Sequence, residues 1–194
     1  MFGHAVVDLM KRGTELIVID PRVNWLASRA KYHLQVRPGT DTALALAMLN
    51  VIINEELYDK EFVDKWCYGF DKFSERVQEY PPERAAEITG IPVDKIISAA
   101  RFFGKSSPAS ICWGLATDQK ANGTQMAHCI VALMAITGNI DVPGGILLGE
   151  AAPVGDLWSD SETGVGYKEL PQELLDKIVG MKEYPAYVGL VMNA

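Results

Sequence analysis

The run of four apolar residues from Leu16 to Ile19 constrains the fold more strongly than any other part of the sequence. Three of the four are β-branched, and charged residues or proline bound the run, which is typical of a parallel strand buried on both faces. A helix over Ala5 to Arg12 precedes this strand, and Tyr32 to Val36 alternates like a second, half-buried strand. A short helix capped by Asn24 connects the two, and a long apolar helix over 42–54 follows. This order predicts an α/β fold with a doubly wound, mostly parallel sheet and helices on both faces.

The rest of the chain is predicted to be mainly helical, with a third core strand at Ala109 to Trp113. Proline, glycine and capping residues predict helices at Lys60–Cys67, 82–88, Pro92–Gly104 and Thr124–Thr137. We expect a polar loop over 117–123, a helix over 171–179 and a late strand over 187–192. From Pro143 to Glu169 the composition shifts to Gly, Pro, Asp and Ser. This segment is too long for a simple connector, which indicates a functional or interdomain excursion.

Charge and cysteine content exclude several classes of protein. The 194-residue chain has 18 Lys and Arg against 25 Asp and Glu, a net charge of −7 and a pI near 5.0. It therefore lacks the basic surface that nucleic-acid binding requires. Three cysteines that lie far apart fit neither a disulfide scaffold nor a metal site built from C-x-x-C units. The most apolar stretch, Ala43 to Ile53, is much shorter than the roughly 20 residues that span a membrane. We expect no nucleic-acid partner, no membrane span and no metal ligands.

Two polar residues follow the first predicted strand, at the edge of the sheet where ligands of open α/β proteins bind. The carboxylate of Asp20 can accept hydrogen bonds from a ribose hydroxyl or from purine N–H groups, and Arg22 can meet a phosphate. The alternative is that Asp20 only caps the next turn and that Arg22 is solvated. Both interpretations stay open on the residues alone.

The second predicted strand leads into a sharp turn at Arg37-Pro38-Gly39-Thr40-Asp41. Pro38 fixes the direction of the chain, and Gly39 lets the backbone come close to a ligand. The two oxygens of an ionised Asp41 match the adjacent N1–H and N2–H₂ donors of guanine. The alternative is that Asp41 caps its own helix.

The third predicted strand ends at Trp113-Gly114, and the loop after it contributes Asp118, Gln119 and Asn122. No catalytic residue is indicated. A G-x-G-x-x-G motif does not follow the first strand, which counts against a standard NAD or FAD site, and no P-loop, G-x-S-x-G or H-E-x-x-H motif occurs. The three histidines have no partners at metal-ligand spacing and are interpreted as structural.

Several motifs occur together, in the order found in one enzyme family. They are Glu15–Arg22, Arg37–Leu44, Leu57–Val63, Trp113–Gly114, Gln119, Asn122–Gly123, Leu133–Asn139 and Pro143–Gly145. In these motifs the chain resembles the molybdopterin oxidoreductases, the family of dimethyl sulfoxide reductase and formate dehydrogenase. Enzymes of that family hold molybdenum or tungsten between two molybdopterin guanine dinucleotides.

The resemblance implies a role for each matched residue. Asp20 would bind the guanosine part of one dinucleotide, with Arg22 beside it, and Pro38, Gly39 and Asp41 would form the guanine pocket. The residues that would reach toward the pterin are Trp113, Gly114 and Gln119, of which Gln119 is matched least closely because this loop varies in length.

The resemblance also implies a domain organisation. Residues 1–145 would form a Rossmann-like domain that binds molybdopterin guanine dinucleotide, and 146–194 an irregular interdomain segment that begins the return into a neighbouring domain. Members of the family are several times longer, so we expect the chain to be an internal piece of a molybdenum or tungsten oxidoreductase. The metal-ligating residue and a [4Fe-4S] cluster would lie upstream.

The expected partners are the other domains of the parent enzyme and electron-transfer subunits. The piece alone is expected to be inactive, and apolar surface left for the other domains would favour self-association. A bacterial or archaeal cytoplasm or periplasm, with membrane association through partners, is compatible with the family, and the sequence does not choose between them. The alternative function is a stand-alone nucleotide-binding or interaction module without a redox cofactor.

Overall fold

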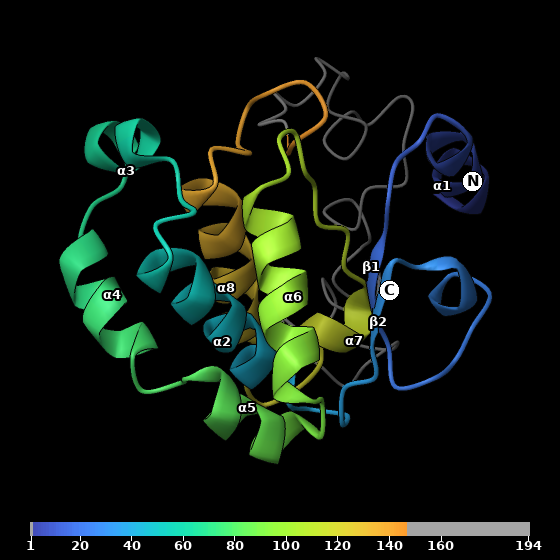
Figure 1. Ribbon diagram of the computed structural model, residues 1–194, viewed down its shortest axis with the longest axis horizontal. Coiled ribbons are helices and arrows are strands. Elements are labelled where there is room, and N and C mark those ends of the chain that lie inside the picture. Colours follow the sequence, from blue (N-terminus) through green and yellow to red (C-terminus); the bar gives the residue numbers. More distant parts are fainter. Residues whose placement is uncertain (1, 147–194) are drawn as a thin grey trace, which may run out of the picture. The chain divides into compact units, whose positions relative to one another are not determined.

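The computed structural model describes residues 2–146, which all belong to one compact unit that spans residues 1–148. The elements of this unit are labelled in Figure 1. They are α1 (Phe2–Lys11), β1 (Ile17–Ile19), the 3₁₀ helix η1 (Ala27–Arg29), β2 (Tyr32–Leu34), α2 (Asp41–Asn54), α3 (Lys60–Trp66), α4 (Phe70–Val77), α5 (Pro82–Thr89), α6 (Val93–Gly104), α7 (Leu115–Asp118) and α8 (Gly123–Ile136). The predicted order of the first five elements is confirmed. The helix predicted over 171–179 and the strand over 187–192 lie outside the described residues.

The two strands form a parallel pair in which Ile17 lies opposite Tyr32 and Ile19 opposite Leu34. In Figure 1, α1 and η1 lie on one side of this pair, and α2, α6 and α8 lie on the other. Both strands end at the edge of the unit where α2 begins (Figure 1). A small parallel sheet among helices is thus present in the described residues, and the larger doubly wound sheet stays a prediction.

The prediction that the first strand is buried on both faces is wrong for the described residues. Ile17 and Val18 are only half-buried, and Ile19 is 42% exposed. A run of β-branched residues favours an extended backbone, but burial of both faces requires neighbouring strands and covering helices. Among residues 2–146, β1 has β2 as its single partner strand.

The predicted third core strand at Ala109–Trp113 is also wrong. This segment carries no strand pairing in the described part of the chain, and Trp113 is 42% exposed. Its alternation of half-buried and exposed residues resembles that of a strand, but a strand needs a partner for its backbone hydrogen bonds. The loop expected over 117–123 contains the last residues of the short helix α7 and the first residue of α8.

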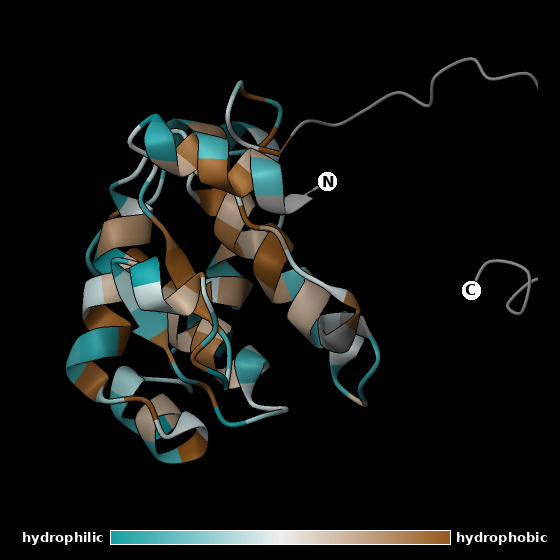
Figure 2. Cartoon of the chain, turned by 90° about the vertical axis from the view of Figure 1, so that its right-hand side faces the viewer, coloured by the Kyte–Doolittle hydropathy of each residue, from teal (hydrophilic) through white to brown (hydrophobic). Residues whose placement is uncertain are grey.

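The core of the unit is built around α2, which is apolar on all sides. Leu44, Leu49 and Ile52 are at most 1% exposed, and α2 packs against α5, α6 and α8. A helix that is apolar all round belongs in an interior. The outer helices carry apolar and hydrophilic residues in alternation (Figure 2), as expected for helices with one face on the core. Among the described residues, no helix has both the length and the apolar character needed to cross a membrane.

Candidate functional site

The chain leaves β2 through a tight turn formed by Arg37, Pro38, Gly39 and Thr40. The backbone N–H of Thr40 donates to the carbonyl of Arg37 over 3.2 Å, and Gly39 has a φ of +85°. Proline followed by a left-handed glycine at the central positions is typical of a type II turn. The backbone N–H of Arg37 donates to the carbonyl of Thr89 at 2.9 Å. This contact anchors the turn to the end of α5.

Asp41 is the first residue of α2, and among the described residues its carboxylate makes no hydrogen bond to its own helix. The N-cap residue is Thr40, whose hydroxyl donates to the carbonyl of Arg37 at 2.7 Å. Oδ2 of Asp41 forms an ion pair with the ammonium of Lys120, which lies 79 residues further along the chain. The side chains of Lys120 and Asp41 are 19% and 21% exposed. The Asp41 carboxylate therefore points into a partly sheltered contact between two distant segments.

Asp20 uses its carboxylate within its own turn. Oδ1 accepts the backbone N–H of Arg22 at 2.7 Å, and Oδ2 accepts the side-chain amide of Asn24 at 2.8 Å. Asn24 in turn accepts the backbone N–H of Ala27 at 2.9 Å and so holds the turn that leads into η1. The N-cap residue of η1 is Leu26, not Asn24 as predicted. The side chain of Arg22 is 84% exposed and lies 3.7 Å from Asp20. Asp20 thus orders the turn after β1, as one of the two interpretations of the sequence expected.

The remaining predicted site residues lie around α7. Trp113 and Gln119 are exposed, and Gln119 is the C-cap residue of α7, directly after its last residue Asp118. Gly114 precedes α7 with φ −110° and ψ 176°, a conformation open to any residue. A Cβ atom on Gly114 would meet no atom within 4 Å. There is therefore open space beside Gly114, although the backbone conformation of this residue does not require glycine.

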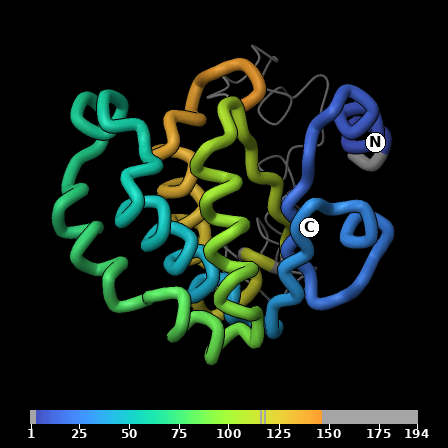
Figure 3. The backbone as a smooth tube through the Cα atoms, viewed as in Figure 1, coloured from blue at the N-terminus to red at the C-terminus, as the bar shows by residue number. Residues whose placement is uncertain are grey.

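The loop between α7 and α8 is brought against the start of α2 by two side-chain contacts. Besides the ion pair of Lys120 with Asp41, the amide of Asn122 donates to the hydroxyl of Thr42 at 3.1 Å. From this end, α2 and α8 run side by side in the same direction (Figure 3). The structure thus joins the turn after β2 to the α7–α8 loop. The side chains of Asp20 and Arg22 contact their own turn, and the backbone of Asp20 contacts β2: its N–H donates to the carbonyl of Leu34 at 3.3 Å, and its carbonyl lies 2.9 Å from Nε2 of His33.

Sequence reasoning missed Lys120 and Thr42 as members of this site. A lysine in a polar loop has no local pattern that identifies a partner on another element. Thr42 lies in the predicted helix and in the motif Arg37–Leu44, but neither assigns it a contact. Only the packing of α8 beside α2 brings these side chains together.

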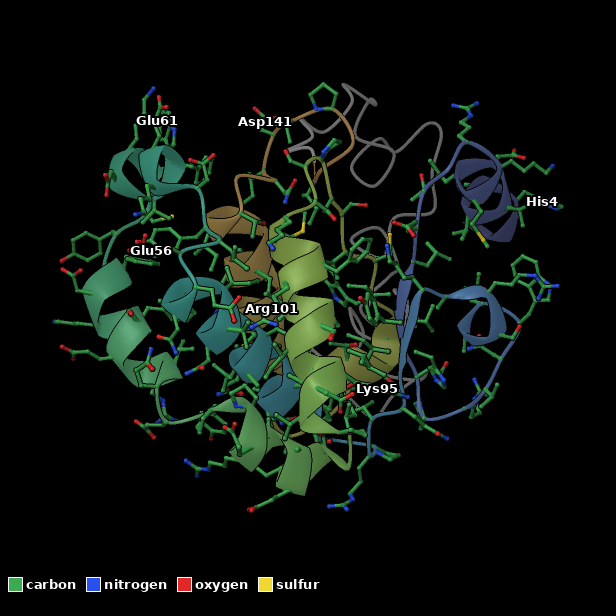
Figure 4. All side chains as sticks on the ribbon, in the orientation of Figure 1. His4, Glu56, Glu61, Lys95, Arg101 and Asp141 are labelled. Atoms are coloured by element: carbon green, nitrogen blue, oxygen red, sulfur yellow. The ribbon has the colours of Figure 1, made fainter. Side chains whose placement is uncertain are left out.

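A second candidate location is a shallow cleft of about 350 Å³ between β2 and α6, lined by Lys31, Tyr32, Arg101, Phe102 and Lys105 with two serines. Two of its cations already have acidic partners: Lys31 pairs with Glu15 at 2.8 Å, and Arg101 forms a two-pronged pair with Glu55. Figure 4 labels Arg101 on α6. These two cations therefore serve the packing of the unit, and Lys105 alone does not make a site for a charged ligand.

No group of three or more His, Cys, Asp or Glu side chains suited to a metal ion occurs within residues 2–146. The residues around the start of α2 offer a carboxylate, an amide, a hydroxyl and an ammonium group. Such groups recognise hydrogen-bonding and charged ligands. The described residues around the start of α2 include no nucleophile paired with a base.

Comparison with known proteins assigns the chain to a family. The family model described as molybdopterin oxidoreductase matches residues 3–187, and the chain belongs to this family. Acetylene hydratase from Syntrophotalea acetylenica is 45% identical over 183 residues. Formate dehydrogenase H from Escherichia coli (strain K12) is 32% identical over 197 residues. The solved structure of acetylene hydratase from Pelobacter acetylenicus matches 66% of this chain with a TM-score of 0.66 and 51% sequence identity.

These relatives are much longer than the chain. The match covers 93% of this chain but 24% of the Syntrophotalea acetylene hydratase, and 96% of this chain but 27% of formate dehydrogenase H. It covers 18% of the solved acetylene hydratase chain. The resemblance to the family is confirmed, and the chain corresponds to about a quarter of the length of these two relatives.

Proposed function

We propose that this chain is the part of a molybdenum or tungsten enzyme that holds the guanine end of a molybdopterin guanine dinucleotide. Asp41 is the central residue of the proposal because its carboxylate is turned away from its own helix and lies beside the turn at Gly39. The proposed guanine contact places the N1–H and N2–H₂ donors of the base on the two oxygens of Asp41. The proposal rests on the orientation of the Asp41 carboxylate, which makes no hydrogen bond to its own helix among the described residues.

The donors and acceptors of the turn fit such a group. Among the described residues, the Oδ1 atom of Asp41 accepts no hydrogen bond. A Cβ atom on Gly39 would meet nothing within 4 Å, so the described chain leaves the turn open on that side. Pro38 and the anchored backbone of Arg37 hold the turn in place before a ligand arrives, which lowers the entropy lost on binding.

Asp20 and Arg22 are proposed to bind the guanosine part of the same dinucleotide. The carboxylate of Asp20 is held in one orientation by two hydrogen bonds, and each of its oxygens keeps a further lone pair for a ribose or base donor. The side chain of Arg22 is 84% exposed, and its guanidinium, 3.7 Å from the Asp20 carboxylate, can also meet a phosphate. Both residues follow β1, which ends at the same edge as β2.

The residues around α7 are proposed to reach toward the pterin. Trp113 offers an exposed aromatic ring, Gln119 an exposed amide and Gly114 backbone that a ligand can approach. Aromatic, amide and backbone groups suit a flat heterocycle with many hydrogen-bonding atoms.

The cofactor would supply the two-electron or oxygen-atom chemistry, and the residues of this chain would bind and orient it. The names of the relatives include a hydratase and a formate dehydrogenase. A segment shared by proteins with such different names is better suited to holding a common cofactor than to choosing a substrate. The metal ligand, a [4Fe-4S] cluster, further domains and electron-transfer subunits are proposed for the parent enzyme. We expect the chain alone to show no metal-dependent turnover with a reduced dye as electron donor.

Calorimetric titration with GDP tests the proposal, because GDP carries the guanine, ribose and diphosphate of the dinucleotide end. We expect the wild-type chain to bind GDP more tightly than ADP. Asp41→Asn replaces one acceptor oxygen by a donor and should weaken GDP binding at least about tenfold, the loss of roughly one good hydrogen bond. Asp94→Asn is the matched control because Asp94 is an exposed acid in the first turn of α6.

Equal GDP affinity in the wild type and in Asp41→Asn would contradict the proposal and favour a nucleotide-binding or interaction module of another kind. Equal affinity for GDP and ADP would contradict recognition of the guanine edge, since adenine presents one donor and one acceptor there. Circular dichroism of both variants checks that a loss of binding is not a loss of folding.

A further inference from the structure

Lys120 is the one charged side chain that the described residues place on the Asp41 carboxylate. The ion pair joins the loop after α7 to the first residue of α2, and about four-fifths of each side chain is shielded from solvent. An ion pair in this setting is screened less by water and salt than one on an open surface.

The loop that carries Lys120 is fixed by further contacts. The carbonyl of Lys120 accepts the backbone N–H of Gly123 at 2.9 Å, and the amide of Asn122 donates to the hydroxyl of Thr42. Gly123 is buried and is the first residue of α8. The backbone at Lys120 can therefore stay in place while the long side chain moves, because Lys120 contacts Asp41 through its ammonium group.

The same carboxylate cannot serve a lysine and a guanine equally well. A guanine edge presents two parallel donors, so it needs both oxygens of Asp41 in one plane. The ammonium group occupies Oδ2 with a charge-assisted hydrogen bond, which is stronger than a bond from a neutral base N–H. Oδ2 keeps a second lone pair, but about four-fifths of each side chain in the ion pair is shielded from solvent, so we expect an incoming guanine to displace the ammonium group rather than to bind beside it.

We propose that Lys120 sets the affinity of the guanine site, because its ammonium group pairs with the Asp41 carboxylate and has to leave it when the base binds. The inference rests on the proposed function and adds a residue that none of the sequence motifs contains. Lys120 also keeps Asp41 from being an unpaired, partly buried acid when no base is bound, which would otherwise destabilise the start of α2.

Guanosine is the ligand for the test, because it has no phosphate that Lys120 could attract. We expect Lys120→Met to raise guanosine affinity about fivefold, which corresponds to removing a competing ion pair worth about 1 kcal/mol. Adding Asp41→Asn should abolish the gain. Lys60→Met is the matched control. Lys60 is the first residue of α3 and pairs with Glu56 at 2.9 Å, and its replacement should leave guanosine binding unchanged.

A second measurement needs no variant and keeps the test independent of folding. Lysine acetylation followed by mass spectrometry reports how accessible each ammonium group is in the wild-type chain. Saturation with guanosine should increase the labelling rate of Lys120 and leave that of Lys60 unchanged. Saturation with adenosine should change neither rate.

The outcomes separate this inference from the function on which it rests. The inference alone would be overturned if guanosine binding depends on Asp41 but Lys120→Met binds guanosine no more tightly than the wild type. Protection of Lys120 from acetylation by guanosine would overturn it as well. Guanosine binding that does not depend on Asp41 in either background would overturn the proposed function and the inference with it.

Discussion

The side-chain carbonyl of Asn139 accepts the backbone N–H of Ala109 at 2.8 Å and so joins the end of α8 to the segment that follows α6. Asn139 is fully buried, and its amide donates to the hydroxyl of Thr137 at 2.8 Å. A polar contact inside the core therefore holds the extended segment that runs on to Trp113 and α7. The position of the candidate pterin-facing residues depends on this contact.

We expect Asn139→Leu to destabilise the chain by about 1–3 kcal/mol, because the N–H of Ala109 would lose its buried acceptor. Urea denaturation followed by circular dichroism measures this loss of free energy of unfolding. Gln35→Leu is the control, since Gln35 is exposed and the carbonyl of Pro21 to which it donates is exposed and can turn to water. Equal losses in the two variants would show that burial of the Asn139 contact adds nothing.

Gly138 directly follows Thr137, the C-cap residue of α8, and cannot be replaced without strain. Its φ is +67°, and a Cβ atom would stand 2.6 Å from Oδ2 of Asp59, the residue that caps α3 through the N–H of Phe62. We expect Gly138→Ala to lower the free energy of unfolding by about 2 kcal/mol or more, from left-handed strain and the clash together.

Gly13 offers the matched comparison for Gly138. It also has a positive φ, +94°, but a Cβ atom there would meet nothing within 4 Å. Gly13→Ala should therefore cost only the backbone strain, about 1 kcal/mol. Thermal unfolding of the two variants under one buffer condition gives the difference, and a larger loss at Gly13 would contradict the role assigned to Asp59.

The pair of Glu55 and Arg101 joins the end of α2 to α6. The hydrogen bond from Arg101 lowers the pKa of the Glu55 carboxyl below its ordinary value of 4.5. A lowered pKa means that the pair stabilises the folded chain above about pH 4.5 and that this contribution is lost as the pH falls further. Both side chains are substantially exposed, so we expect Glu55→Gln to cost no more than about 1 kcal/mol at pH 7 and less at pH 3. Urea titrations at the two pH values test this.

Local sequence patterns predicted the elements whose signals lie within the element itself. The long helix α2 was predicted within one residue of its start because its apolar run is preceded by a turn with proline and glycine. The helix α4 was not predicted, although Phe70, Phe73 and Val77 lie at helical spacing. The segment at Ala109–Trp113 has a strand-like pattern, but a pattern does not provide the partner strand.

The candidate site shows the same division between local and distant information. The turn at Pro38 and Gly39 could be predicted because its conformation follows from the residues in it. Asp20 and Asp41 both follow a strand, and sequence alone left each with a capping and a binding interpretation. In the structure Asp20 contacts Asn24 four residues on, whereas Asp41 contacts Lys120, which is 79 residues away. Such a pair is fixed by packing, which no local pattern encodes.

Cys129 and Cys112 should differ sharply in reactivity. Burial raises the pKa of the Cys129 thiol to about 11, whereas Cys112 is exposed. At pH 8 only about one thousandth of Cys129 is thiolate, the form that reacts. We expect iodoacetamide to label Cys112 in the native chain and Cys129 only after unfolding. Because the raised pKa belongs to the folded state, its contribution to stability is present below pH 9 and is lost between pH 9 and about 11. Native labelling of Cys129 at pH 8 at the rate of Cys112 would contradict its place in the core.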